Sequence, residues 1–334
     1  MPLSAQDRAV RYEASHNAMG TVFTVVAYGR DSKYLGEVAN KIFDEIDRLD
    51  AQMSNYRPES ELSALNRDAA RQAVTVEPGL FALIEESLQY SRETDGAFDI
   101  TVGPLMKVWG FLDGKARLPR PAELAGVMKR VGYHHVRLDT GRRQVRFDQD
   151  GIELDLGGIA KGYAVDRAID ILRESGVSAA LVSSGTSSVY ALGAPPEERG
   201  WKVVVRDPLE AKKAGDTVWL KDCSLSVSGN YEKFVTIKGR RYAHIMNPRT
   251  GRPVEDMLST TVLATRATQS DALSTAFFVL GVDRTRRYLA SYPDLAAILY
   301  QPADSDQGFK RIVLRSALYQ VPQGSLAEIQ ENRR

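Results

Sequence analysis

The segment from Asp155 to Asp166 reads Asp-Leu-Gly-Gly-Ile-Ala-Lys-Gly-Tyr-Ala-Val-Asp and combines a glycine pair with a lysine. We expect Gly157 and Gly158 to form a tight turn before a helix, where backbone N–H groups and the positive helix end attract an anion. Lys161, in the first turn of that helix, adds a cation suited to phosphate. The spacing matches neither a nucleotide P-loop nor a dinucleotide-binding turn, so an ordinary tight turn explains the segment equally well.

A second polar group stands at the head of a predicted helix, in the segment Ser-Asp-Ala-Leu-Ser-Thr that ends at Thr275. Asp271 and Thr275 are four residues apart and therefore share one helix face. Their oxygens are of the kind that Mg²⁺ prefers, and Mg²⁺ usually shares its coordination sphere with a phosphate. The alternative is that Asp271 is only a capping or first-turn acid that stabilises its own helix.

His244 begins the segment His-Ile-Met-Asn-Pro-Arg-Thr-Gly-Arg-Pro, whose Asn-Pro and Thr-Gly pairs are typical of turns. We therefore place His244 where a strand passes into a loop. Imidazole titrates near neutral pH, which makes this residue a candidate acid–base group, although a lone histidine is more often structural. Two further polar segments, around Tyr56 and Phe98, are typical of cleft walls, but their residues alone do not name a ligand.

The elements that must position these segments are helices and strands in no regular alternation. Apolar residues at helical spacing predict helices at 35–49, 80–88, 121–131, 165–172 and 270–280. Alternating or β-branched runs predict strands at 19–28, 136–138, 145–147, 152–156, 201–205, 225–227, 234–237, 260–263 and 295–300. Residues 152–184 then read as a strand, a glycine turn, a helix closed by Gly176 and another strand, a βαβ-like unit. The irregular order predicts an α+β fold.

The composition of the chain excludes several classes of function. The chain has 334 residues, is 43% hydrophobic and carries a net charge of +1, so it can bury a core but has no field that would gather nucleic acid. No apolar run reaches the roughly 18 to 20 residues of a membrane helix. The single cysteine, Cys223, excludes an intrachain disulfide and a cysteine-based metal cluster. Because no signal peptide follows Met1, we expect a cytoplasmic location for the chain as it stands.

In chain order, six segments resemble the FAD:protein FMN transferases, the ApbE-like flavin transferases. They are Met19-Gly-Thr21, Met53 to Asn66, Asp95 to Phe111, Asp155 to Asp166, His244 to Pro253, and Asp271 to Thr275. The chain departs from the family pattern in two places. Residues Gly185-Thr186-Ser187 stand where the family often has Gly-Gly followed by Asn or Asp, and Asn247 stands where many members have Asp.

The resemblance implies a single flavin-transferase fold of the α+β class, in which mixed and antiparallel sheets are flanked by helices around a central FAD cleft. It places the flavin transferase domain at residues 19–320, without a clean internal linker. Residues 1–18 would form an N-terminal extension, and residues 321–334 a polar C-terminal tail.

The resemblance also implies two groups of site residues. Those that would line the FAD site are Met19, Tyr56, Ala97, Phe98, Asp99, Asp155, Lys161 and Ile245. Those that would hold Mg²⁺ are Gly158 through its carbonyl, Asp271 and Thr275 through their side chains, and, as a weaker candidate, Ser274.

The implied reaction is attack by a Thr or Ser hydroxyl of an acceptor protein on the FMN-side phosphorus of FAD, which leaves FMN in phosphoester linkage and releases AMP. We assign His244 the catalytic role of taking the hydroxyl proton, with an Asp near the metal as its rival. One alternative is a Mg²⁺-dependent FAD pyrophosphatase, in which water replaces the hydroxyl and the products are FMN and AMP. Another is a flavin-binding carrier without turnover, which has less need of a metal set.

The resemblance further implies the acceptor class and the compartment. Family members modify flavoprotein subunits of Na⁺-pumping NADH:quinone oxidoreductases and of Rnf-type complexes. They are typically exported or membrane-anchored, so the family favours the periplasm or cell envelope over the cytoplasm.

Overall fold

The structure is a computed structural model that describes residues 9–112, 117–210, 212–231, 234–237, 239–303 and 308–315. Its α-helices are α1 (Ser32–Met53), α2 (Glu61–Asp68), α3 (Pro78–Glu93), α4 (Gly103–Val108), α5 (Pro121–Met128), α6 (Ala160–Glu174) and α7 (Ala267–Ala290). Within these ranges, two short 3₁₀ helices span Ile100–Val102 and Tyr133–His135.

In the described part of the chain, the strands form one large sheet and four small ones. The large sheet contains β1 (Val10–Ala18), β2 (Thr21–Gly29), β6 (Ala179–Ser184), β7 (Ser188–Leu192), β10 (Cys223–Gly229), β15 (Ser259–Ala264), β16 (Ala296–Pro302) and β17 (Phe309–Leu314), in that spatial order. The small sheets contain β3 (Val74–Thr75), β4 (Val136–Asp139) and β5 (Gln144–Phe147); β8 (Trp201–Arg206) and β9 (Ala214–Leu220); β11 (Phe234–Ile237) and β12 (Arg240–Ala243); and β13 (Met246–Asn247) and β14 (Arg252–Pro253). All neighbours are antiparallel, so with the helices the chain has the predicted α+β fold.

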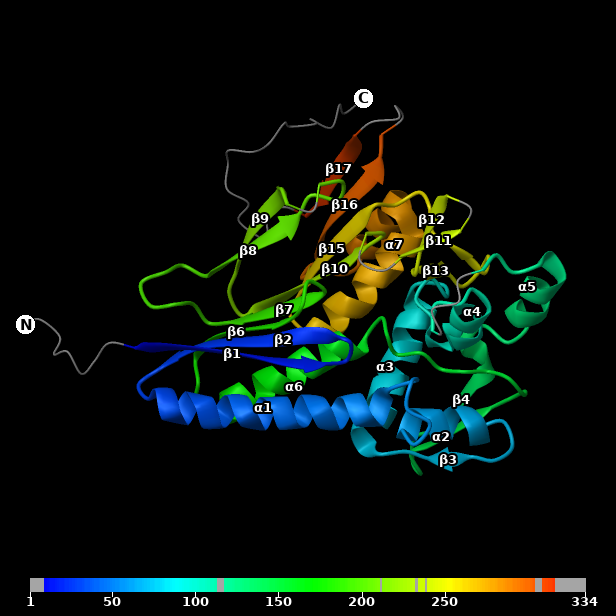
Figure 1. Ribbon diagram of the computed structural model, residues 1–334, viewed down its shortest axis with the longest axis horizontal. Helices are drawn as coiled ribbons and strands as arrows, with labels where there is room; N and C mark the ends of the chain where they lie inside the picture. Colours follow the sequence, from blue (N-terminus) through cyan, green and yellow to red (C-terminus); the bar gives the residue numbers. More distant parts are fainter. Residues whose placement is uncertain are drawn as a thin grey trace, which may run out of the picture.

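The large sheet separates two hydrophobic layers (Figure 1). On one face, α1 contacts β1 and β2, α6 contacts β6 and β7, and α7 contacts β10 and β15. On the other face, the β8–β9 hairpin packs its Val205 and Val218 against Leu225 and Val227 of β10. The alternation of side chains along β10 therefore sends successive residues into different layers.

The βαβ-like unit predicted at residues 152–184 is wrong. Residues 152–156 form no strand, although Ile152, Leu154 and Leu156 are buried. Their backbone groups bond elsewhere, since Leu154 N donates to the Asn66 side chain at 2.7 Å and Asp155 N donates to the Ile100 carbonyl at 2.7 Å. The following helix α6 leads into β6, which pairs antiparallel to β2.

Two predicted boundaries also change. Helix α7 begins at Ala267, three residues before the predicted start, and continues past a break at Gly281 to Ala290. Strand β1, which lies within the predicted extension 1–18, pairs with β2 along its full length and so belongs to the large sheet. Residues 1–8 and the predicted tail 321–334 lie outside the described residues. Within the described residues, none of the helices combines the length and apolarity needed to cross a membrane.

Candidate functional site

Helices α6 and α7 approach each other very closely at Gly162. A Cβ atom at this position would lie 2.2 Å from the Ala267 carbonyl oxygen and 2.6 Å from the Asp271 Cβ. Real side chains cannot make such contacts, so only glycine permits this approach. The crossing places the N-terminal turns of the two helices side by side.

Each helix supplies a carboxylate that caps the N-terminus of the other. Asp271 of α7 accepts a 2.8 Å hydrogen bond through Oδ2 from the N–H of Gly162, the third residue of α6, which has no acceptor within its own helix. Asp166 of α6 accepts hydrogen bonds from Ala267 N at 2.7 Å and Thr268 N at 2.9 Å, in the first turn of α7. Burial raises the pKa of Asp166, and these hydrogen bonds oppose the shift.

This arrangement corrects the simpler alternative for Asp271. The residue is not a cap of its own helix, because it is the fifth residue of α7 and its acceptor oxygen serves α6. The two helix N-termini also point their partial positive charges into one region. The Asp166 and Asp271 carboxylates are the anions that this region holds in the structure.

Three segments that are far apart in the sequence meet at Gly158. A Cβ atom there would lie 3.3 Å from Thr275 Oγ1 and 3.4 Å from Cε2 of the Phe98 ring. The glycine turn, helix α7 and the Ala97–Asp99 segment therefore share one wall of the site. The predicted FAD contact Phe98 and the predicted metal ligands Gly158 and Thr275 are brought together.

Three serines of β10, which we call the serine row (Ser224, Ser226 and Ser228), face α7. Ser226 Oγ lies 2.7 Å from Ser270 Oγ, and Ser228 Oγ lies 2.8 Å from Ser274 Oγ and 3.3 Å from Thr275 Oγ1. Sequence reasoning missed Ser228. The signal that could have found it is the alternation of serines along a predicted strand, which puts all three on one face.

The oxygens of this region fit a hard cation. Oδ2 of Asp271 is bonded to Gly162, whereas Oδ1 has no hydrogen-bond partner within the described part of the chain. Thr275 Oγ1 and the Gly158 backbone lie close by. Ser274 is less suited, because its hydroxyl is buried and engaged with Ser228 and with the Asp271 carbonyl at 2.9 Å. The donor chemistry therefore matches Mg²⁺ through Asp271, Thr275 and Gly158.

Tyr56, Asp155 and Lys161 form a neighbouring polar group around the glycine turn. Asp155 Oδ1 accepts a 2.8 Å hydrogen bond from Gly157 N, and Lys161 Nζ donates to the Gly157 carbonyl at 3.3 Å. Partial burial and the Asp155 charge raise the pKa of Tyr56, whose side chain is nevertheless 67% exposed. The group thus offers an exposed aromatic ring and a lysine, which suit a ligand that carries both a ring and a phosphate.

The Ala97–Asp99 segment is more deeply buried than its predicted role suggests. Ala97 and Phe98 belong to the main hydrophobic core. Asp99 accepts hydrogen bonds from Thr101 N at 2.8 Å, from Thr101 Oγ1 at 2.6 Å and from Tyr133 N at 2.7 Å, and burial raises its pKa against the effect of these bonds. Asp99 thus has a structural role that the sequence did not reveal. Its contact with FAD stays a prediction.

Met19 lies at the same end of the large sheet as Ser228, in the turn between β1 and β2 and not in the glycine turn before α6. It connects β1 and β2 with a φ of 49°, and the adjacent Gly185 turn donates from its N–H to the Val22 carbonyl at 2.7 Å. An open cavity of about 460 Å³ borders the Met19 turn. Its neighbours there are Asn17 to Val22 and Asp50, and none of the other predicted FAD contacts lines this cavity.

His244 follows β12 directly, as predicted for a strand-to-loop edge, and the structure shows that it is half-buried. Ile245 is buried in the main core, which also contains Phe98. Asn247 accepts a 3.0 Å hydrogen bond from Arg249 N through its side-chain oxygen and so forms the turn of this loop. An amide oxygen performs this task as well as a carboxylate would, which explains how the loop retains its turn without Asp at this position.

Comparison with known proteins gives one consistent result. The ApbE family model matches residues 19–299. Among the similar proteins named FAD:protein FMN transferase, one from Treponema pallidum (strain Nichols) is 32% identical over 88% of this chain and 86% of the relative. Another, from Escherichia coli (strain K12), is 30% identical over 80% of this chain and 78% of the relative. Similar solved structures include the ApbE protein from Thermotoga maritima, with a TM-score of 0.84 and 30% sequence identity. They also include the flavin transferase ApbE from Vibrio cholerae, with a TM-score of 0.82 and 27% sequence identity. Each match covers 92% of this chain and 98% of the solved one.

Proposed function

The chain belongs to the ApbE family, and on that basis we propose that it transfers FMN from FAD to a Thr or Ser hydroxyl of an acceptor protein, with Mg²⁺ bound and AMP released. It is an enzyme of the transferase class, and FAD is its flavin substrate. The proposed roles of the residues in this reaction are supported mainly by the contact between Phe98, Gly158 and Thr275. This contact joins a proposed flavin segment to a proposed phosphate turn and to hard oxygen ligands.

The phosphates of FAD would lie against the glycine turn that precedes α6. The Lys161 ammonium and the partial positive charge at the start of α6 would attract the negative charge of the pyrophosphate. Asp271, Thr275 and the Gly158 carbonyl would hold Mg²⁺, which supplies further charge neutralisation at the phosphorus that is attacked. The flavin ring would extend toward Phe98 and Tyr56.

The chemical step forms one bond and breaks one. The acceptor oxygen bonds to the FMN-side phosphorus, the bond from that phosphorus to the bridging oxygen breaks, and AMP leaves with that oxygen. We propose that His244 takes the proton of the hydroxyl, because an imidazole at a strand-to-loop edge can reach a substrate and titrates near neutral pH. Asp271 is a poorer base, because one of its oxygens is already bonded to Gly162.

The test is incubation of the purified protein with FAD, Mg²⁺ and an acceptor domain. Acceptor domains from Na⁺-pumping NADH:quinone oxidoreductases and Rnf-type complexes are the proposed partners, in line with the family resemblance and with a location at the cell envelope. An FMN adduct seen by mass spectrometry, with AMP in equal amount, supports the proposal. FMN and AMP without an adduct indicate an FAD pyrophosphatase, and bound but intact FAD indicates a carrier.

A further inference from the structure

A separate cavity of about 240 Å³ opens beneath the β8–β9 hairpin, on the face of the large sheet opposite α7. Apolar side chains of β7, β8 and β10 form much of its wall, among them Val189, Val205, Leu225 and Val227. The described residues that line it include none of the predicted FAD contacts and none of the predicted metal ligands. This cavity is therefore distinct from the site described above.

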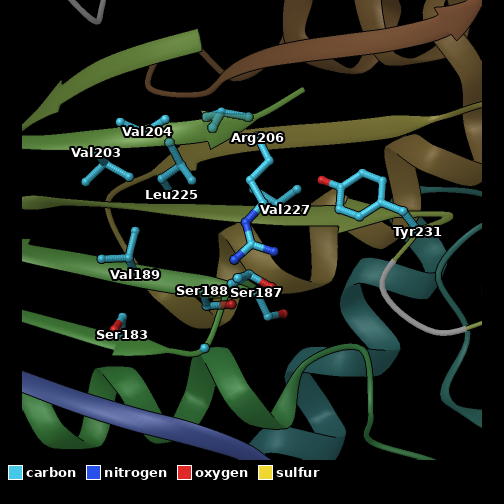
Figure 2. A pocket seen from close by; sticks show the side chains of 13 residues that line it. Ser183, Ser187, Ser188, Val189, Val203, Val204, Arg206, Leu225, Val227 and Tyr231 are labelled. Carbon is cyan, nitrogen blue, oxygen red and sulfur yellow. The ribbon is translucent and has the colours of Figure 1, made fainter. Parts of the chain in front are cut away.

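Arg206 reaches from β8 into the cavity. Figure 2 shows its guanidinium directed toward Ser187 and Ser188. Within the described part of the chain, the Arg206 side chain makes no ion pair and no hydrogen bond. The described residues that line the cavity include no acidic side chain. The cavity therefore holds a positive charge that the surrounding protein does not neutralise.

Ser187 adds a buried hydroxyl to the same cavity. The residue is only 8% exposed, and its Oγ makes no hydrogen bond within the described residues. Buried hydroxyls normally have a partner, and an unpaired one is often completed by a ligand or a water. The neighbouring Ser188 differs, because its Oγ accepts a 2.9 Å hydrogen bond from Ser226. Arg206 and Ser187 therefore offer unused donors that one anion would satisfy.

A β-bulge lies at Arg206. The register of β8 and β9 shifts between Val205 and Arg206, and Gly215 has no partner in the pairing. A Cβ atom at Gly215 would lie 3.0 Å from the Arg206 carbonyl oxygen and 3.0 Å from the Tyr300 hydroxyl, so glycine suits this crowded position. Bulges of this kind re-aim side chains and are common beside active sites.

The bulge is also fixed to the large sheet. The next residue, Asp216, is 3% exposed and accepts hydrogen bonds from Arg311 Nε at 2.9 and 3.1 Å and from the Tyr300 hydroxyl. Arg311 and Tyr300 belong to β17 and β16. Because the hairpin that carries Arg206 is held in this way, its backbone needs little ordering when a ligand binds.

The volume of the cavity limits the size of a ligand. An apolar cavity of about 150 Å³ binds benzene, whereas drug-sized molecules occupy about 300 to 1,000 Å³. A cavity of about 240 Å³ therefore has room for an apolar group of benzene size and one small charged group, and it is too small for FAD. Val204, which also lines the cavity, is 52% exposed, so a molecule of this size can enter from solvent.

A carboxylate matches the polar end of the cavity. A guanidinium presents its N–H groups in a fork that fits a carboxylate, with stronger hydrogen bonds than a neutral donor gives. The Ser187 hydroxyl can donate to the same group. A phosphate fits less well, because its higher charge and three acceptor oxygens need more donors than one arginine and one hydroxyl supply.

The cavity and the transfer site share strand β10. Val227 lines the cavity, and the next residue, Ser228, contacts Thr275 at 3.3 Å on the other face of the strand. Since successive side chains of a strand point to opposite faces, a ligand in the cavity and a metal at Thr275 would lie on opposite sides of β10. FAD and a ligand of the cavity can therefore be bound together.

We propose that this cavity is a second ligand site, which binds a small monocarboxylate with a compact apolar body while FAD occupies its own cleft. The carboxylate pairs with Arg206 and accepts a hydrogen bond from Ser187, and the apolar body packs against Val205, Leu225 and Val227. The proposal goes beyond the transfer reaction and does not depend on it.

The test is an NMR titration of the purified chain with benzoate, with and without saturating FAD and in the absence of Mg²⁺. Benzoate joins a benzene ring to one carboxylate, benzamide keeps the ring without the charge, and acetate keeps the charge without the ring. The variants are Arg206→Gln, Ser187→Asp and Lys202→Gln. Lys202 is exposed on the same strand and does not line the cavity, so its variant matches the loss of charge.

We expect wild type and Lys202→Gln to bind benzoate in the millimolar range or tighter, and to bind benzamide and acetate at least about 10-fold more weakly. Arg206→Gln should bind benzoate about 10- to 100-fold more weakly than wild type, the loss of a charge-assisted hydrogen bond, with benzamide unchanged. Ser187→Asp should bind benzoate no better than Arg206→Gln, because its own carboxylate then neutralises the guanidinium.

Three results would overturn the proposal. They are no binding of benzoate by wild type at about 20 mM, equal binding by wild type and Arg206→Gln, and binding that disappears when FAD is present, which places benzoate in the FAD cleft. Acetate that binds as tightly as benzoate would also exclude the apolar part of the site. FAD affinity is measured in the same samples, and a failure to bind FAD would count against the transferase function and not against the second site.

Discussion

Replacement of Asp271 by Asn or by Ala separates the two tasks that the structure gives this carboxylate. Ala removes the acceptor of the Gly162 N–H, so a buried donor at the start of α6 loses its partner at a cost of about 1.5 to 3 kcal/mol. The unfolding entropy of a chain of 334 residues is about 0.7 kcal/mol/K, which converts this cost into a fall of the melting temperature by about 2 to 4 °C. Asn keeps an acceptor oxygen for Gly162, and we expect its melting temperature to fall by less than half as much.

Both variants should lose the FMN transfer reaction, since an amide is a far weaker ligand for Mg²⁺ than a carboxylate. The assays are calorimetric melting without ligand and mass spectrometry of the FMN adduct. Asp166→Ala serves as the matched control, because it removes the cap of α7 without touching the proposed metal ligands. It should lower the melting temperature as Asp271→Ala does and retain activity. Equal melting temperatures for Asp271→Ala and Asp271→Asn would refute the capping role, and an active Asp271→Asn would refute the metal role.

Three further predictions concern other parts of the site. Gly162→Ala should destabilise the protein by about 1 to 3 kcal/mol, because α6 and α7 must separate to accommodate the methyl group. The control Gly126→Ala has open space around its Cβ and should be neutral or stabilising by up to about 1 kcal/mol. Urea unfolding measures both free energies. His244→Ala should slow FMN transfer by about 10²- to 10⁴-fold with FAD affinity little changed, and calorimetric binding that is lost instead would make His244 a flavin contact. Burial raises the pKa of Asp99 above its unfolded value near 4, so the folded state binds this proton more tightly. Wild type should therefore gain stability relative to Asp99→Asn as pH falls from 7 toward 4, and an unchanged difference between the two unfolding free energies contradicts this.

Local periodicity in the sequence was enough to predict many of the elements. The spacing of Leu35, Val38, Ile42, Ile46 and Leu49 predicts α1, and all five side chains are buried in the structure. The same kind of reasoning fails at residues 152–156, because alternation reports burial and not strand pairing. Those residues alternate inward and outward, yet the Asn66 side chain and the Ile100 carbonyl occupy the positions that a partner strand would take.

Contacts between distant elements could be predicted only in part. The spacing of Asp271 and Thr275 places them on one helix face, but nothing within that helix shows that Asp271 caps α6 or that Ser228 lies beside Thr275. Both facts depend on how α7 crosses α6 and β10. Likewise, the burial of Asp99 depends on Tyr133, whose N–H it binds across a distance of 34 residues in the sequence.

The serine row also fixes the position of α7 on the large sheet. A helix packed through apolar side chains alone tolerates small sliding movements, since dispersion contacts vary gently with distance. The hydroxyl pairs between β10 and α7 are 2.7 to 3.0 Å long and weaken steeply when the atoms move apart. Advancing α7 by one residue shifts it by 1.5 Å and turns it by about 100°, which breaks every one of these pairs. The hydroxyl pairs therefore fix the position of α7 along its axis and its rotation about that axis. In this way the sheet sets where Thr275 and Asp271 present their oxygens before any ligand binds.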